Sequence, residues 1–181
     1  MSGRSAAVSA AEGRARVAVL VGSKLWRVPG LKPAEQARKA ARAALAAAGR
    51  GGPEPVELAI LLSADAEVRA LNRRWRGEDK PTNVLSFPSG AAAGPRGRRL
   101  LGDVVLAYET LAREAEAADK PLAHHLSHLV VHGVLHLMGH DHERPAEARR
   151  METLEVREST DAFAAWISSS GPEIEFGTVP G

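Results

Sequence analysis

The sequence contains no cysteine, and only 4% of its 181 residues are aromatic. The lack of cysteine excludes disulfide bonds, thiolate metal ligands and a cysteine nucleophile. Because aromatic residues are scarce, the core must consist mainly of aliphatic side chains. No stretch approaches the ~20 consecutive apolar residues that a membrane span needs. The first 16 residues include Arg4, Glu12, Arg14 and Arg16, which makes them a poor secretory signal. We therefore predict a cytoplasmic protein without membrane contact.

The residues that are present are those of an ordinary globular protein. Apolar residues make up 44% of the chain and charged residues 25%. The length is enough for one compact domain with a sizeable core. We predict a single domain over residues 14–168, preceded by a disordered lead over residues 1–13. The Gly- and Pro-containing residues 169–181 are expected to form a flexible tail.

Charge is unevenly distributed along the chain. Residues 1–100 contain 18 Lys and Arg against 8 Asp and Glu, a net charge of +10, whereas residues 101–181 contain 6 against 14, a net charge of −8. The basic half could face a polyanion such as RNA. Alternatively, the two halves could neutralise each other in the fold. The sequence favours neither reading.

Apolar runs and Pro or Gly punctuation predict an α+β fold. Strands are expected over 14–21, 56–62, 83–87 and 100–108, with an interruption of the last at Gly102–Asp103. Helices are expected over 33–49, 64–75, 109–118, 121–139 and 145–166, and Ser63 is the expected cap of the second. This order predicts one domain with a small mixed β-sheet packed with helices. It does not give the order of the strands.

All seven histidines lie between residues 124 and 142, and three of them have a spacing that is typical of a metal site. In the segment HGVLHLMGHDH, His132 and His136 are four residues apart, so on a helix they project from the same face. Gly139 can end that helix in the left-handed conformation, which lets His142 return as a third ligand. We predict that His132, His136 and His142 bind one transition-metal ion.

Zinc is the expected metal, one ion per chain. Three imidazoles leave a tetrahedral zinc with an open position for water, which is the arrangement of a catalytic site. Imidazole also suits nickel, copper and iron. Of the other histidines, His128 is expected to be packed or hydrogen-bonded, whereas His124, His125 and His140 are expected to face solvent.

The residue after the first predicted ligand separates this pattern from that of a metallopeptidase. The spacing of the three histidines equals that of the extended zincin motif, in which a Glu follows the first His and acts as the general base. Here the position holds Gly133, which has no side chain. Peptide hydrolysis by that mechanism is therefore disfavoured, and no other general base is identified.

HGVLHLMGHDH closely resembles the signature of the YbeY family, the metal-dependent endoribonucleases of ribosomal RNA maturation. LNRRWRGEDKPTNVLSFP and LGDVVL resemble two further blocks of that family, in the same order. The likeness covers roughly residues 55–160. Two positions depart from the family pattern, since Asn83 stands where many members have Asp, and His140 where many have Tyr.

The resemblance implies an α+β fold with a central metal-binding helix. It also implies cleavage of single-stranded RNA, chiefly in the 3′-end maturation of small-subunit ribosomal RNA and in ribosome quality control, with small-subunit ribosomal proteins as possible partners. His132, His136 and His142 match the family's metal ligands, and Arg76 matches its functional arginine.

A guanidinium at residue 76 could bind the scissile phosphate through two hydrogen bonds. The alternative for Arg76 is a solvated charge that pairs with Glu78 or Asp79. Trp75 is expected to be a core anchor and not a platform for base stacking. Several other cations are candidates for contacts with the RNA backbone: Arg73, Arg74, Lys80, Arg96, Arg98 and Arg99.

Two other functions fit the residues less well. One is a non-enzymatic ribosome-associated factor whose zinc only stabilises the fold, against which the open coordination position argues. The other is a metallopeptidase, against which Gly133 argues. The sequence gives neither the oligomeric state nor the RNA sequence that would be cut.

Overall fold

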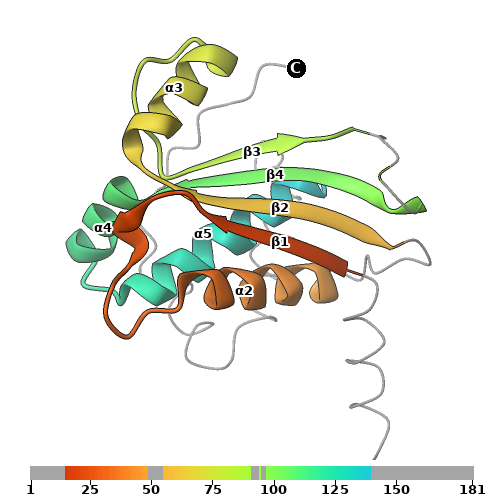
Figure 1. Cartoon of the computed structure of the whole chain (residues 1–181), viewed down its shortest axis with the longest axis horizontal. Coiled ribbons are helices and arrows are strands. Elements are labelled where there is room, and N and C mark those ends of the chain that lie inside the picture. The colour runs from red at the N-terminus through yellow and green to blue at the C-terminus, as the bar shows by residue number, and fades with distance from the viewer. Residues whose placement is uncertain (1–14, 49–54, 91–93, 95–96, 140–181) are drawn as a thin grey trace, which may run out of the picture.

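The structure is a computed structural model that describes residues 15–48, 55–90, 94 and 97–139 (Figure 1). The elements within these ranges are β1 (Ala15–Val21), the short 3-10 helix η1 (Lys24–Trp26), α2 (Pro33–Ala47), β2 (Val56–Ser63), α3 (Asp65–Arg76), β3 (Val84–Pro88), β4 (Arg99–Ala107), α4 (Tyr108–Ala117) and α5 (Leu122–Leu137). They confirm the strands and helices predicted between residues 14 and 139. The predicted helix over 145–166, the lead and the tail lie outside the described residues.

The four strands form one mixed sheet in the order β1-β2-β4-β3. β1 pairs in parallel with β2, and β2 with β4, whereas β3 pairs antiparallel with β4 at the edge. The α+β class and the small mixed sheet are therefore as predicted. The parallel pairs are joined by crossovers that include α2 and α3.

The main core lies between the sheet and the pair of helices α2 and α5, which run side by side across one face (Figure 1). Alternate residues of β2, Leu58, Ile60 and Leu62, are buried in this core. Such alternation is expected because successive side chains of a strand point to opposite faces. α5 is buried along almost its whole length, and the buried residues include His125 and His132.

The opposite face of the sheet is covered only in part. A second, smaller cluster joins Val68 of α3 with Leu85, Val105 and Ala107 of the strands. Farther along the sheet the apolar face is open, and Leu20 of β1 is 64% exposed. The molecule therefore has one packed face and one face that is partly accessible.

β4 contains a β-bulge at the position where an interruption was predicted. Glu57 of β2 pairs with Leu100 and the next residue, Leu58, pairs with Gly102, so Leu101 is the extra residue. Gly102 has a φ of +134°, a conformation that favours glycine. The expected interruption is thus wrong: the strand is continuous and only its register shifts.

The predicted cap of α3 is also wrong. The residue before the helix is Ala64, and Ser63 still belongs to β2, where its hydroxyl donates to Glu67. Instead, the starts of α3 and α4 cap each other. The backbone N–H of Asp65 donates to Glu109 over 2.8 Å, and the carboxylate of Asp65 accepts from the backbone N–H of Thr110 over 3.0 Å. A tertiary contact therefore replaces the local one.

Candidate functional site

Four histidines form a column along α5. The ring centroids of His125 and His128 are 6.2 Å apart, those of His128 and His132 are 6.5 Å apart, and those of His132 and His136 are 4.5 Å apart. His132 is buried and His136 half-buried. The last pair is close enough for both imidazoles to reach one ion, as the spacing of four residues predicts.

The third predicted metal ligand, His142, lies outside the described residues, as does His140. Gly139 has a φ of +82°, so the helix ends in the predicted left-handed turn. Among residues 15–48, 55–90, 94 and 97–139, no three His, Asp or Glu side chains gather as a metal site. Two borderline-soft imidazoles on adjacent turns do fit part of a zinc site, and the complete site stays a prediction.

His125 is not solvent-facing, which corrects the prediction for that residue. It is only 3% exposed, and its Nε2 lies 2.7 Å from a carboxylate oxygen of Glu114 on α4. The side-chain amide of Asn83 donates to both oxygens of that carboxylate, over 3.0 and 3.2 Å. Asn83 therefore links the loop before β3 to α4. His124 is exposed, as predicted, and His128 is packed between His125 and His132.

Gly133 faces the sheet. A Cβ atom on this residue would lie 2.7 Å from Cγ1 of Val104 and 3.2 Å from Oγ of Ser86. The hydroxyl of Ser86 donates to the carbonyl oxygen of Gly133 over 3.2 Å, so β3 and α5 are also joined by a hydrogen bond. A glutamate at this position could not be accommodated without separating α5 from β4, and this packing adds to the case against a metallopeptidase.

Arg76 is the last residue of α3, which Gly77 ends with a φ of +73°. Its expected alternative partners are engaged elsewhere, since Glu78 pairs with Lys80 at 3.1 Å and Asp79 with Arg69 at 2.9 Å. Within the described part of the chain, Arg76 forms no ion pair. Partial burial lowers the pKa of Arg76, and the nearby Glu78 carboxylate opposes this shift. Arginine nevertheless remains a cation at any physiological pH.

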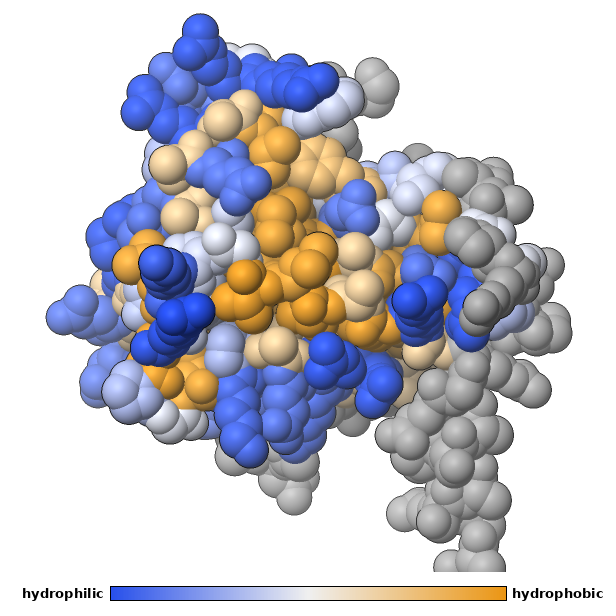
Figure 2. All heavy atoms as spheres, in the orientation of Figure 1, coloured by the Kyte–Doolittle hydropathy of each residue, from blue (hydrophilic) through white to orange (hydrophobic). Residues whose placement is uncertain are grey.

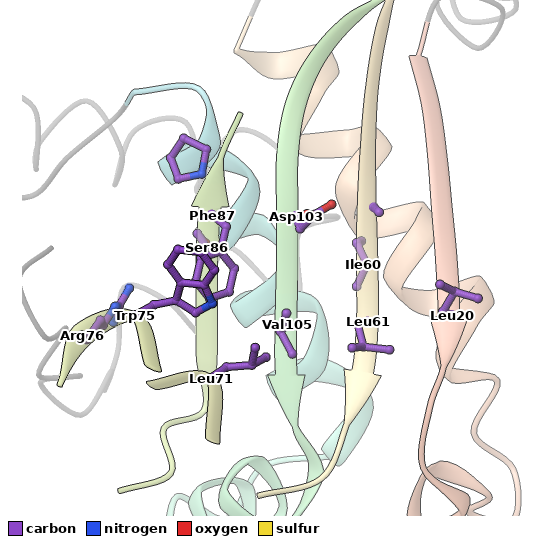
Figure 3. A pocket seen from close by; sticks show the side chains of 12 residues that line it. Leu20, Ile60, Leu61, Leu71, Trp75, Arg76, Ser86, Phe87, Asp103 and Val105 are labelled. Carbon is purple, nitrogen blue, oxygen red and sulfur yellow. The ribbon is translucent and has the colours of Figure 1, made fainter. Parts of the chain in front are cut away.

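A groove of about 690 Å³ lies on the open face of the sheet, between α3 and the strands (Figure 3). Arg76 and Trp75 line it from α3, and Ser86 lines it from β3. Ser86 is therefore in contact with the groove and, through Gly133, with the helix that carries the histidines. The sequence did not indicate this groove, because its residues come from four strands and a helix.

Trp75 is not a core anchor, which corrects another prediction. This residue is 62% exposed. It makes an edge contact with Phe87, with ring centroids 6.4 Å apart, and the guanidinium carbon of Arg74 lies 5.3 Å from its ring centroid. Of the other expected RNA contacts, Arg73, Arg74, Lys80 and Arg99 are exposed, Arg98 is half-buried, and Arg96 lies outside the described residues.

Comparison with known proteins identifies the family. The family model described as Endoribonuclease YbeY matches residues 30–161, most of the chain. The chain belongs to the YbeY family. A YbeY endoribonuclease of a Bradyrhizobium species is 58% identical over 121 residues, which cover 64% of this chain and 72% of that protein. The YbeY endoribonuclease of Azorhizobium caulinodans is 59% identical over 124 residues, covering 67% and 77%.

A solved structure supports the fold. The solution structure of a Thermotoga maritima protein superposes with a TM-score of 0.51 and 22% identity, over 88% of this chain and 98% of that one. The family model and the curated relatives confirm the resemblance to the YbeY family that three sequence blocks indicate. Among the described residues, no helix has the length and apolarity needed to cross a membrane.

Proposed function

We propose that this protein is a metal-dependent endoribonuclease that cleaves single-stranded RNA in ribosomal RNA processing. The observation that carries the proposal is membership of the YbeY family over residues 30–161, a range that includes the histidine pattern and Arg76. The curated relatives from Bradyrhizobium and Azorhizobium are both named endoribonucleases. The reaction is the hydrolysis or transesterification of a phosphodiester bond.

His132, His136 and His142 are the proposed ligands of one zinc ion. The short distance between the first two rings and their position on a largely buried helix support this assignment. When bound, the ion would supply Lewis acidity at the phosphate. A neutral imidazole is required for binding, so affinity for the metal would decrease as the pH falls.

Arg76 is the proposed phosphate-binding residue. It is half-buried at the margin of the groove, and it forms no ion pair with a carboxylate of the described residues. A guanidinium in such a place can donate two parallel hydrogen bonds to phosphate oxygens and stabilise charge that develops there during cleavage. The partial desolvation that lowers the pKa of Arg76 also strengthens its attraction for an anion.

The biological setting belongs to the same proposal. We infer a role in the late 3′-end maturation of small-subunit ribosomal RNA and in ribosome quality control, with proteins of the small subunit as partners. We propose that this role takes place in the cytoplasm.

The test is a cleavage assay with matched variants. Wild type and His136→Ala, prepared identically, are incubated with a labelled single-stranded RNA that has the sequence of a ribosomal RNA 3′ precursor, and the metal content of each is recorded. We expect only the wild type to cleave and to carry about one metal ion per chain. A contaminating ribonuclease would act equally in both preparations. Metal-loaded wild type without any cleavage would contradict the proposal.

Arg76 needs its own comparison. Arg76→Ala should lower kcat/KM by about 100-fold or more, and Arg76→Lys should recover only part of it, because an ammonium lacks the two-pronged geometry. Arg42→Ala is the control, since Arg42 is an exposed arginine of α2, on the opposite side of the sheet. Equal losses for Arg76→Ala and Arg42→Ala would show that only general charge matters.

A further inference from the structure

Trp75 is the largest exposed apolar side chain beside the groove. Figure 3 shows its indole over β3 next to Phe87, with Arg76 beside it at the outer margin. A tryptophan that is 62% exposed gains little from burial, so its place on the surface is not explained by packing. The edge contact with Phe87 fixes its orientation instead. It is therefore a preformed aromatic surface.

The floor of the groove continues from Trp75 across the sheet. Phe87 lies opposite Asp103 in the β3–β4 register, and Asp103 lies opposite Ala59 of β2. The neighbouring row contains Leu61 and Val105. The small side chain of Ala59 leaves this part of the face hollow, and Figure 2 shows apolar side chains gathered over the middle of the sheet. A flat apolar ring can be accommodated there.

Charge is arranged so that the two sides of the groove differ. Arg73, Arg74 and Arg76 all lie in the last turn of α3, and none of them forms an ion pair with a described residue. Asp103 is exposed on the floor, and in the same part of the chain it has neither an ion pair nor a hydrogen bond. Cations on the α3 side attract phosphates, whereas the carboxylate repels them from the floor. This arrangement complements a single strand whose backbone follows α3 and whose bases turn toward the sheet.

We propose that Trp75, supported by Phe87, forms a stacking site for one nucleobase of the single-stranded RNA substrate, next to the phosphate bound by Arg76. The inference rests on the proposed function and adds to it the surface that selects unpaired RNA. An unpaired base can turn away from its neighbours and stack on a side chain, whereas the bases of a duplex are held in pairs and stacked on one another. The site tolerates any base, because every base has a π face.

The inference can be tested by removing either the aromatic ring or the base. Dissociation constants for a short labelled oligoribonucleotide are measured in the full-length His136→Ala background, so that the RNA is not consumed. Trp75→Leu should weaken binding roughly 5- to 100-fold, and Trp75→Tyr should retain most of it. The same oligonucleotide with abasic positions keeps its phosphates. The parent protein, which keeps Trp75, should bind this abasic RNA more weakly than the intact RNA, by a similar factor. The Trp75→Leu variant should bind the two RNAs equally well.

Leu25→Ala is the matched control, because Leu25 is 45% exposed in η1 and does not line the groove. In the wild-type background, Trp75→Leu should raise KM with a smaller effect on kcat. If Trp75→Leu binds the intact RNA as tightly as the parent does, stacking on Trp75 is wrong, whereas cleavage by the wild type would leave the proposed function intact. If the wild type neither binds nor cleaves RNA, the proposed function itself fails.

Discussion

At the scale of single residues, Gly133 determines how closely α5 approaches the sheet. A Cβ there would lie 2.7 Å from Cγ1 of Val104, well inside van der Waals contact. We predict that Gly133→Ala lowers the free energy of unfolding by about 1–3 kcal/mol, because α5 or Val104 must move. Urea denaturation measures this loss as a lower midpoint, and the m-value should be the same as that of the wild type.

The control for Gly133→Ala is a double-mutant cycle with Val104→Ala. Val104→Ala alone should be destabilising because it leaves a cavity in the core. The double variant should be less destabilised than the two single losses together, since the new methyl group occupies part of that cavity. Strict additivity would show that the contact is not the cause.

Glu114 connects two buried polar groups, the imidazole of His125 and the amide of Asn83. Glu114→Ala would leave both without this acceptor, so we predict a loss of about 2–4 kcal/mol in the free energy of unfolding. Glu116→Ala, an exposed position on the same helix, should change it by less than about 0.5 kcal/mol. Similar values for the two variants in thermal unfolding would contradict the assigned role.

Residue-scale predictions from the sequence failed where a tertiary partner decides the environment. His125 has the same local sequence signal as the exposed His124, and only the position of Glu114, eleven residues away on another helix, explains its burial. Trp75 was expected in the core because most tryptophans bury large areas. In the structure it is 62% exposed at the end of α3, where Phe87 and Arg74 contact its ring.

At the scale of elements, the bulge in β4 sets how the edge strand β3 pairs. A Cβ on Gly102 would lie 2.1 Å from the carbonyl oxygen of Phe87, and the φ of +134° disfavours any other residue. We predict that Gly102→Ala lowers the free energy of unfolding by about 2–4 kcal/mol and displaces β3. Gly22→Ala is the matched control, because its nearest contact is the flexible side chain of Leu61 and it should be close to neutral.

The functional consequence of Gly102→Ala separates local from global damage. Phe87 supports Trp75, so a shift of β3 should weaken RNA binding even at temperatures where the variant is still folded. Relative to the wild type, backbone amide hydrogen exchange in the variant should be faster in β3 and little changed in α2. Uniform loosening of all elements would mean that the bulge matters only for overall stability.

The bounds of the elements could be predicted because they depend on local signals. Pro33 at the start of α2 and Gly77 at the end of α3 are such punctuation, and the apolar run of β2 identifies it as a buried strand. The strand order and the bulge could not be predicted, because they depend on pairing between residues far apart in sequence. The same holds for the reciprocal caps of Asp65 and Glu109.

At the scale of the whole molecule, the sheet separates two sets of functional residues. The histidine helix packs on one face, and the groove with Trp75 and Arg76 opens on the other. Edge strand β3 lies between them, and its Ser86 contacts both sides. For one phosphate to contact both Arg76 and the predicted metal ion, the substrate would therefore have to bend around the β3 edge, beside which Arg76 lies.

The unequal charge of the two halves bears on whether the surface at the end of α3 can bind a polyanion. Among the described residues, the ion pair between acidic and basic side chains that joins the halves links Arg113 to Asp65 at 3.2 Å, so it does not neutralise the excess arginines of the first half. The arginines at the end of α3 remain available to a polyanion. This favours the RNA-facing reading for that surface, in line with the groove beside it.

Metal binding should be linked to the stability of the whole molecule, because the proposed ligands join α5 to the segment that follows Gly139. Saturating zinc at about 100 times its dissociation constant would stabilise the folded state by about 2.7 kcal/mol. We therefore predict that a chelator lowers the Tm of the wild type, measured by differential scanning calorimetry, and that His136→Ala and His142→Ala show little further change. His124→Ala should behave as the wild type, since His124 is an exposed residue of the same helix outside the proposed ligand set.

If His124→Ala loses the response to the chelator and His142→Ala keeps it, the ligand assignment is wrong. If His142→Ala folds, binds RNA, responds weakly to zinc and does not cleave, the metal acts in the reaction and is not needed to hold the fold together.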